Sequence, residues 1–188
     1  FSANFRVSVP GRFSLLLSFD AENRTNLPRV WAIGDLVKGP MLAHKAEEEG
    51  VAVAERIAGR KAVTHIERVP SVVYTEPEIA WVGKTEDELK NAGKPYKVGV
   101  FPFMANGRAR AVGETQGFVK MLADAETDLV LGLHIIGPQA GELIAQGCDA
   151  LSFGATAEDL ALICDPHPTF SEAIKEAALA VNKEGINF

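Results

Sequence analysis

The sequence predicts an α+β fold in which an antiparallel sheet is flanked by helices. Two observations support this class: several β-rich runs follow one another through short polar turns, and the helical patterns are grouped in the chain. The clearest hairpin is "GFVKMLADAETDLVLGLHIIG", where two strand-like runs enclose a polar turn from Asp124 to Asp128. Regular alternation of strands and helices, which would indicate a parallel sheet, is not seen after residue 64.

The remaining strands of this sheet are predicted from β-branched and aromatic residues. They cover Val69 to Tyr74, Ile79 to Val82 and the run "YKVGVFPF". Between them, Thr85 and Glu88 have the Thr-x-x-Glu spacing of a capping box, and Gly93 is suited to end the short helix that the box begins.

Three helices are predicted in the last third of the chain. One lies near Glu142 to Ser152, and the next begins at Thr156. The last begins at Thr169, with Glu172 three positions later in a second capping box. Apolar residues recur at helical spacing along this last helix and predict its buried face: Phe170, Ala173, Ile174, Ala177, Ala178 and Val181.

The chain before residue 65 has a different character. Residues 1–26 show no helical or strand period, and we expect them to be an atypical segment, either an engineered remnant, a frame-shifted start or a divergent strand. A short buried strand is predicted from Val30 to Ile33, followed by a helix over residues 40–58. The predicted buried face of that helix is Ala43, Ala46, Gly50, Val53 and Ile57.

One strand and one helix cannot bury both of their faces, so this pair should belong to a larger layer. The apolar run "FSLLLSF" offers one way to cover the helix, and a second copy of the chain offers another.

Composition excludes several classes of function. The net charge is −6 and no basic stripe is present, which argues against a nucleic-acid partner. The run "FSLLLSF" is far too short to span a membrane. Cys148 and Cys164 are sixteen positions apart, which is not a metal-ligand spacing, so we expect two buried thiols and no metal site.

The stretch "CDPHPTFSEAIKEAALAV" holds the strongest candidate for catalysis. Pro166 and Pro168 restrict the backbone on both sides of His167, and Glu172 follows five positions later. A carboxylate beside an imidazole would give an acid/base that works near neutral pH. From the local pattern alone, His167 is equally well explained as a turn residue. Ser171 is not expected to be a hydrolase nucleophile, because no Gly-x-Ser-x-Gly elbow is present.

Gly34 and Asp35, at the end of the predicted strand, form a second candidate. A carboxylate in that position could accept hydrogen bonds from the hydroxyl groups of a sugar or polyol, although it could equally be a turn or helix-capping residue. The helix that follows Pro40 presents free N–H groups at its positive end, which suit an electron-rich ring oxygen.

Three segments together indicate a family. The runs "AIGDLVKGPMLAHKAEEEG", "VPSVVYTEPEIAWVGKTEDELK" and "HPTFSEA" resemble the dihydrolipoamide dehydrogenases, flavoproteins of the pyridine nucleotide–disulfide oxidoreductase family. The resemblance extends from about Thr25 to Phe188. The "MLAHKAEEEG" run disfavours a glutathione reductase, and the lack of a vicinal cysteine pair near the C-terminus disfavours a mercuric reductase.

The resemblance implies a role for each candidate residue. Asp35, with Gly34, would bind the ribitol of FAD. The residues Met41, Leu42, Ala43 and His44 would lie along the flavin. His167 would take a proton from the dihydrolipoamide thiol, and Glu172 would orient it. Asp165 departs from the family pattern, which often has a second histidine at this position, and we expect it to alter the local field without removing the pair.

The resemblance also implies how the chain is organised. Residues 27–64 would be the last part of an FAD-binding domain, and residues 65–188 the interface domain that forms a homodimer. No Gly-x-Gly-x-x-Gly and no closely spaced cysteine pair is present, so we expect a C-terminal portion that binds FAD weakly or not at all by itself. In this family the histidine reaches the flavin and disulfide of the other subunit.

The resemblance implies FAD and NAD as cofactors of the whole protein, lipoyl-carrying components of 2-oxo acid dehydrogenase complexes as partners, and the bacterial cytoplasm or the mitochondrial matrix as its location. We expect the isolated chain to be inactive. The competing hypothesis is a stand-alone dimeric interaction module, or a fragment that has acquired an activity of its own.

Overall fold

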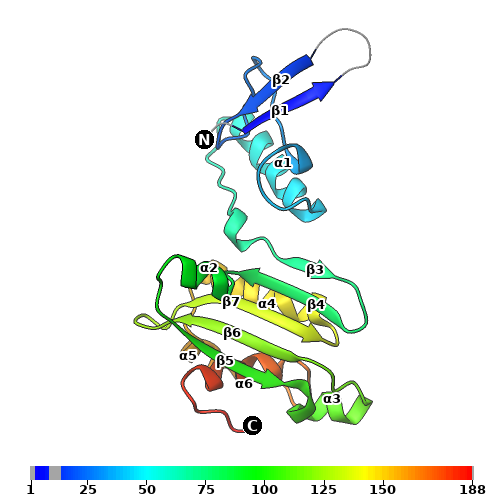
Figure 1. Ribbon diagram of the computed structural model, residues 1–188, viewed down its shortest axis with the longest axis vertical. Helices are drawn as coiled ribbons and strands as arrows, with labels where there is room; N and C mark the ends of the chain where they lie inside the picture. The colour runs from blue at the N-terminus through cyan, green and yellow to red at the C-terminus, as the bar shows by residue number, and fades with distance from the viewer. Residues whose placement is uncertain (1–2, 9–13, 188) are drawn as a thin grey trace. The chain divides into compact units, whose positions relative to one another are not determined.

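The computed structural model describes residues 3–8 and 14–187, and the chain divides into two compact units, Phe1–Ile66 and Glu67–Phe188 (Figure 1). The assignment of residues 1–26, 27–64 and 65–188 to three parts with separate origins stays a prediction. Within the described ranges, no helix is both long and apolar enough to cross a membrane.

The second unit is built on a five-stranded antiparallel sheet with the order β3-β4-β7-β6-β5, which confirms the predicted fold class. The hairpin predicted around Asp124–Asp128 joins β6 to β7, and the Asp124 carboxylate accepts hydrogen bonds from the Glu126 and Thr127 N–H groups in that turn. The strands are β3 (Ser71–Val73), β4 (Glu78–Gly83), β5 (Tyr96–Pro102), β6 (Phe118–Asp124) and β7 (Val130–Gly137).

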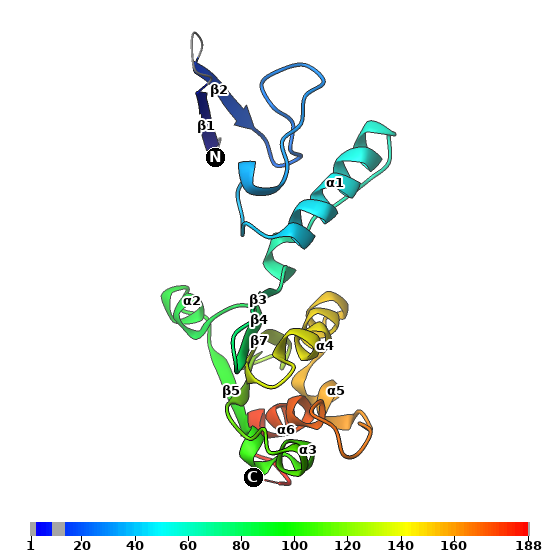
Figure 2. The same cartoon turned by 90° about the vertical axis from the view of Figure 1, so that its right-hand side faces the viewer.

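Helices α4 (Ala140–Phe153) and α6 (Glu172–Val181) cover one face of this sheet, with α5 (Ala157–Leu162) beside α6 (Figure 2). Helix α2 (Glu86–Asn91) lies on the other side, where Glu86 bonds to Lys120 of β6. The predicted face of the last helix is confirmed, because each of its six residues is at most 7% exposed: Phe170, Ala173, Ile174, Ala177, Ala178 and Val181. These side chains form one core with the inward residues of the strands.

One glycine is required by the close packing of α6 on the sheet. A Cβ atom added to Gly99, in the middle of β5, would lie 2.0 Å from the Ala177 carbonyl oxygen and 2.5 Å from the Val181 nitrogen. Both neighbours are backbone atoms, so any side chain at residue 99 would force the helix away from the strand.

Two helix starts follow the predicted chemistry. The Thr85–Glu88 capping box has both of its hydrogen bonds, and Thr156 with Asp159 forms a second complete box at the start of α5. A further helix, α3 (Gly107–Val112), was not predicted. Its signals are an N-cap asparagine, Asn106, and Gly113 with a positive φ just past its end. The short 3₁₀ segments η2 (Ile66–Arg68) and η3 (Phe103–Ala105) complete the connections.

The first unit contains β1 (Ala3–Ser8) and β2 (Ser14–Phe19), which pair in antiparallel register, then the 3₁₀ turn η1 (Gly34–Leu36) and α1 (Ala43–Ile57). Residues 1–26 show no sustained period in the sequence, and the described part of them contains these two strands. The apolar run "FSLLLSF" begins at Phe13, which lies outside the described residues.

The strand predicted from Val30 to Ile33 is wrong. This segment forms an isolated bridge between Arg24 and Trp31 instead of a strand. Its other backbone hydrogen bonds go to nearby loop residues, such as the Ala32 N–H to the Asn23 carbonyl oxygen and the Thr25 N–H to the Val30 carbonyl oxygen. An extended run becomes a strand only when neighbouring backbone satisfies its hydrogen bonds, and the described residues provide a single bridge here.

The buried face of α1 differs from the predicted one. Of the predicted residues, Val53 is buried, but Ile57 is 60% exposed. The buried positions are instead Lys45, Glu49, Ala52 and Val53. Two charged residues at i and i+4 occupy the inner face because they pair with each other, a possibility that a hydrophobic pattern does not register.

Candidate functional site

His167 and Glu172 form a hydrogen-bonded pair in the loop between α5 and α6. The Nδ1 atom of His167 lies 2.8 Å from Oε1 of Glu172. An ionised carboxylate only accepts hydrogen bonds, so Nδ1 carries the proton and the neutral ring keeps its lone pair on Nε2. The histidine side chain is 74% exposed and that of the glutamate 24% exposed. The pair therefore presents a basic nitrogen to the outside of this unit.

The same glutamate holds the loop that carries the histidine. Its second oxygen, Oε2, accepts a hydrogen bond of 2.8 Å from the Thr169 N–H. This is only half of the predicted capping box, because the Thr169 hydroxyl bonds to the Pro166 carbonyl oxygen and to the Ser171 hydroxyl instead. Helix α6 consequently begins at Glu172 rather than at Thr169. The Ser171 hydroxyl lies 2.8 Å from the Thr169 hydroxyl.

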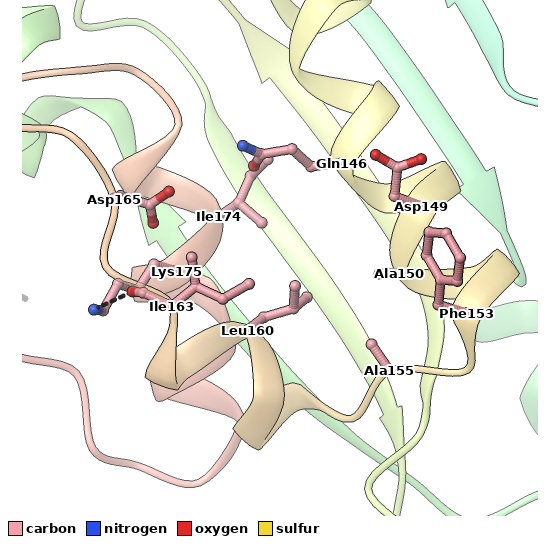
Figure 3. A pocket seen from close by; sticks show the side chains of 10 residues that line it. All are labelled: Gln146, Asp149, Ala150, Phe153, Ala155, Leu160, Ile163, Asp165, Ile174 and Lys175. Carbon is pink, nitrogen blue, oxygen red and sulfur yellow. Dashed lines mark hydrogen bonds between the residues drawn. The ribbon is translucent and has the colours of Figure 1, made fainter.

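Asp165 lies two positions before the histidine, on the edge of an apolar hollow of about 250 Å³ (Figure 3). Burial raises the pKa of the Asp165 carboxyl, the Lys175 ammonium opposes that rise, and the Glu172 carboxylate adds to it. Asp165 is thus in electrostatic reach of the pair. The hollow is lined by residues of α4, α5 and α6 and of the loops before and after α5: Gln146, Asp149, Ala150, Phe153, Ala155, Leu160, Ile163, Asp165, Ile174 and Lys175.

The other predicted site residues lie in the first unit. Gly34 is buried and has a positive φ of 67°, which favours glycine, while the neighbouring Asp35 is exposed in η1. A Cβ atom on Gly34 would come within 3.1 Å of the Ala46 Cβ. The backbone of the turn therefore lies directly against α1 at Gly34, while Asp35 remains exposed.

A buried ion pair fixes this turn, and the hydrophobic pattern of the sequence did not indicate it. Lys45 Nζ donates to the Gly34 carbonyl oxygen at 3.0 Å, and Glu49 Oε2 accepts from the Gly34 N–H at 2.6 Å. The two side chains are 2.9 Å apart and only 1% and 3% exposed. Every polar group of Gly34 is thus satisfied by the first two turns of α1.

The start of α1 carries the remaining candidates. Leu42 occupies the N-cap position and has no side chain that can accept a hydrogen bond, so the first N–H groups of the helix lack a side-chain cap. Met41 is 75% exposed, and Ala43 and His44 are exposed as well. These residues and Asp35 form one group in the first unit, while His167 and Glu172 form a separate group in the second.

The two cysteines are not part of either group. Both are free thiols, Cys148 half-buried and Cys164 exposed, so the expectation of two buried thiols is wrong for Cys164. Burial raises the pKa of the Cys148 thiol. Cys164 lies in the loop between α5 and α6.

Comparison with known proteins identifies the family. Residues 69–178 match the pyridine nucleotide-disulphide oxidoreductase dimerisation domain. The chain belongs to this family. It is 58% identical over 171 residues to the dihydrolipoyl dehydrogenase of Cupriavidus necator, covering 91% of this chain and 36% of that protein. It is 56% identical over 182 residues to the mitochondrial dihydrolipoyl dehydrogenase 2 of Arabidopsis thaliana, covering 97% and 34%.

A solved structure agrees with these relatives. LpdA from Mycobacterium tuberculosis is 28% identical and superimposes with a TM-score of 0.80, over 85% of this chain and 35% of that one. The chain therefore spans about a third of the length of the proteins that it matches. The predicted resemblance to a C-terminal portion of the dihydrolipoamide dehydrogenases is confirmed, and the stand-alone module is not favoured.

Proposed function

We propose that this chain provides the interface domain of a dihydrolipoamide dehydrogenase, with His167 and Glu172 as its acid/base pair. The observation that carries the proposal is the 2.8 Å contact between His167 Nδ1 and Glu172 Oε1, which leaves Nε2 of an exposed ring as a base. The high identity to dihydrolipoyl dehydrogenases supports the same reaction class.

In the whole protein, Nε2 of His167 would accept a proton from a thiol of dihydrolipoamide. The thiolate, not the thiol, is the nucleophile in disulfide exchange, so a base beside the substrate sulfur raises the reactive fraction. Glu172 stabilises the imidazolium that forms and keeps the ring in one orientation. Overall, dihydrolipoamide and NAD⁺ give lipoamide, NADH and one proton. FAD, when bound to the whole protein, supplies the means of passing the electron pair from the thiols to NAD.

The first unit fits the role of holding part of FAD. The exposed Asp35 carboxylate can accept hydrogen bonds from ribitol hydroxyls, and the N–H groups at the start of α1 have no side-chain cap and can donate to a carbonyl oxygen of the flavin ring. Met41, Leu42, Ala43 and His44 would lie along the ring. The Lys45–Glu49 pair would keep Gly34 and Asp35 fixed against that helix.

We further propose that the protein is a homodimer and that the apolar surface around α5 contributes to the interface. Phe153 is 87% exposed, Leu162 77% and Ile163 50%. Phe153 and Ile163 line the hollow in Figure 3, and Leu162 is the last residue of α5, next to Ile163 in the chain. Exposed side chains of this size, next to one another, mark a protein-interaction surface. The match to a dimerisation domain supports a second copy of the chain as the occupant.

The partners in the cell would be the lipoyl-carrying components of a 2-oxo acid dehydrogenase complex, because these present dihydrolipoyl groups to the enzyme. Its location would be the bacterial cytoplasm or the mitochondrial matrix, in line with the bacterial and mitochondrial relatives.

The test is an assay of the whole protein that contains this chain. We expect a flavin absorbance spectrum and reduction of NAD that depends on dihydrolipoamide. The 188-residue chain, purified alone and supplied with FAD and NAD, should show no turnover. Measurable turnover by the chain alone, or a whole protein that lacks flavin, would contradict the proposal.

The dimer is tested by size-exclusion chromatography at micromolar concentration. Leu162→Glu places a charge in the proposed interface and should shift the chain from dimer to monomer. Ile57→Glu changes an equally apolar residue that is 60% exposed in the first unit, and it should leave the dimer intact. A monomeric native chain would overturn this part of the proposal.

A further inference from the structure

Asn106 is a buried polar residue that joins α3 to the loop carrying His167. Asn106 is only 3% exposed. The Oδ1 atom accepts a hydrogen bond of 2.9 Å from the Ala109 N–H and so caps α3. The Nδ2 atom donates a hydrogen bond of 3.0 Å to the Thr169 carbonyl oxygen. One amide group therefore satisfies a helix start and a loop carbonyl that lie 63 positions apart in the chain.

Two further contacts come from the same short stretch of chain. A Cβ atom on Gly107 would lie 3.7 Å from Cε1 of His167 and 4.0 Å from Cβ of Pro168, so the first residue of α3 lies directly against the imidazole. The Phe103 and Phe170 rings meet edge to face, with their centroids 6.1 Å apart. Residues 103–107 thus support residues 167–170 at three points.

We propose that Asn106 is a positioning residue for His167, and that it acts through the Thr169 carbonyl. This inference rests on the acid/base role proposed for His167. The ring is 74% exposed, so few side chains restrict it from outside, and its orientation depends on the loop beneath it. Two bonds hold the backbone of Thr169: the Glu172 carboxylate accepts from its N–H, and the Asn106 amide donates to its carbonyl oxygen. Losing the second bond would leave the Thr169 backbone held only through its N–H.

Two substitutions separate the bond to the loop from the cap of α3. Asn106→Ser keeps a good N-cap oxygen but has no amide donor. Asn106→Asp keeps the cap and the side-chain shape, and it replaces the donor with an oxygen that the Thr169 carbonyl repels. The Asp variant also adds a charge, and Asn91→Asp, on an exposed residue at the end of α2, is the matched control for that charge.

The measurement is the ¹⁵N NMR spectrum of the imidazole nitrogens in the 188-residue chain, at a pH where the ring is neutral. The chain has four histidines, and the His167 signals are those missing from His167→Gln. In the native chain we expect one tautomer, with the proton on Nδ1. Both Asn106 variants should raise the population of the other tautomer several-fold, and Asn91→Asp should not.

An unchanged tautomer ratio in both Asn106 variants would overturn the proposal. The same conclusion would follow if only Asn106→Asp changed the ratio, because the added charge would then be the cause. If Asn106→Ser does not fold, Asn106→Thr takes its place, because threonine also keeps an N-cap oxygen, has no amide donor and adds no charge.

The rate of the whole protein separates this inference from the proposed function. We expect Asn106→Ser to lower kcat about tenfold with little change in KM, because a slightly misplaced base loses rate rather than affinity. If the His167 ring populates both tautomers while kcat is unchanged, the positioning role of Asn106 is supported and the acid/base role of His167 is wrong. If the tautomer ratio of His167 is unchanged, the positioning role of Asn106 is wrong, whatever the value of kcat.

Discussion

Two side-chain pairs with nearly equal separations have opposite surroundings in this protein. Lys45 and Glu49 are 2.9 Å apart and almost completely buried, whereas His167 and Glu172 are 2.8 Å apart and the ring is 74% exposed. In both pairs the glutamate also accepts a backbone N–H, from Gly34 in one and from Thr169 in the other. The distance alone does not distinguish a pair that holds the fold from a pair that can do chemistry.

The two pairs differ in whether a polar atom remains available to a substrate once the pair has formed. Lys45 uses its ammonium on Glu49 and on the Gly34 carbonyl oxygen, within a buried site. A buried ion pair of this kind is stable only while its hydrogen bonds are complete. His167 uses one nitrogen on Glu172 and keeps the other exposed, so it can exchange a proton with a substrate.

The largest effect is expected at the exposed pair, and it should be on rate. His167→Gln in the whole protein removes the base and should lower the rate of dihydrolipoamide oxidation by about 10²–10⁴-fold. Because the ring is exposed, the thermal stability of the 188-residue chain should change little. Steady-state assays and thermal unfolding measure the two effects. A large loss of stability would show that this pair, too, is mainly structural.

At the buried pair the effect should be on stability. Lys45→Met leaves Glu49 charged and buried, which typically costs about 3–5 kcal/mol. The two tryptophans, Trp31 and Trp81, lie in different units, so each reports on one of them. In a Trp81→Phe background the fluorescence of Trp31 reports on the first unit, and Lys45→Met should strongly lower the stability of that unit in chemical unfolding. In a Trp31→Phe background the fluorescence of Trp81 reports on the second unit, and Lys45→Met should leave its stability unchanged. An equal loss of stability in the two units would contradict a local role for the buried pair.

A third pair is intermediate in exposure and sharpens the comparison through its pH dependence. Glu86 and Lys120 are 2.6 Å apart and 28% and 26% exposed. The hydrogen bond from Lys120 lowers the pKa of Glu86 below its ordinary value of 4.5, and the Tyr96 hydroxyl adds to this, against the effect of burial. A depressed pKa in the folded state gives stability that is present above 4.5 and lost as the pH falls below it.

Glu86→Gln should therefore lower the free energy of unfolding of the second unit by about 1 kcal/mol or less at pH 7. The difference from the native chain should shrink as the pH is lowered from 5 toward 3 in urea unfolding experiments, roughly across the range where the carboxyl gains its proton. A difference that stays constant over this range would mean that the pair contributes through packing and not through its charge.

The smallest effect is expected beside the exposed pair, at Asp165. Burial raises the pKa of this carboxyl, so the folded chain favours its neutral form and loses stability as the pH rises through the unfolded-state value. Asp165→Asn should therefore stabilise the chain at pH 7 by less than about 1 kcal/mol. The gain should vanish in acid, where the native side chain is protonated as well. A destabilised variant at pH 7 would show that the Lys175 ammonium outweighs the burial.

Much of the second unit could be predicted from its residues. The hairpin around Asp124–Asp128, the Thr85–Glu88 capping box and the buried stripe of the last helix depend on neighbours in the sequence, and all three are present in the structure. The contact between His167 and Glu172 is also local, because only five positions separate the two residues. Its catalytic role stays a prediction until the rates are measured.

The predictions that failed concern groups whose partners are distant. The segment from Val30 to Ile33 has the composition of a strand, but a strand needs paired neighbours that the sequence pattern cannot supply. Lys45 was not recognised as buried because its partner at Gly34 lies eleven positions away, in another element. Helix α3 was missed because it is short, and its cap Asn106 gains its second bond from a residue 63 positions away.

The sequence by itself determined the α+β class, the capping boxes at Thr85 and Thr156 and the close spacing of His167 and Glu172, because these depend on local spacing and on turn and cap chemistry. Only the tertiary structure decided which charges are buried and which are exposed. That outcome depends on whether distant backbone groups, such as Gly34 for Lys45 or Thr169 for Asn106, complete the hydrogen bonds that a polar side chain needs when it leaves water.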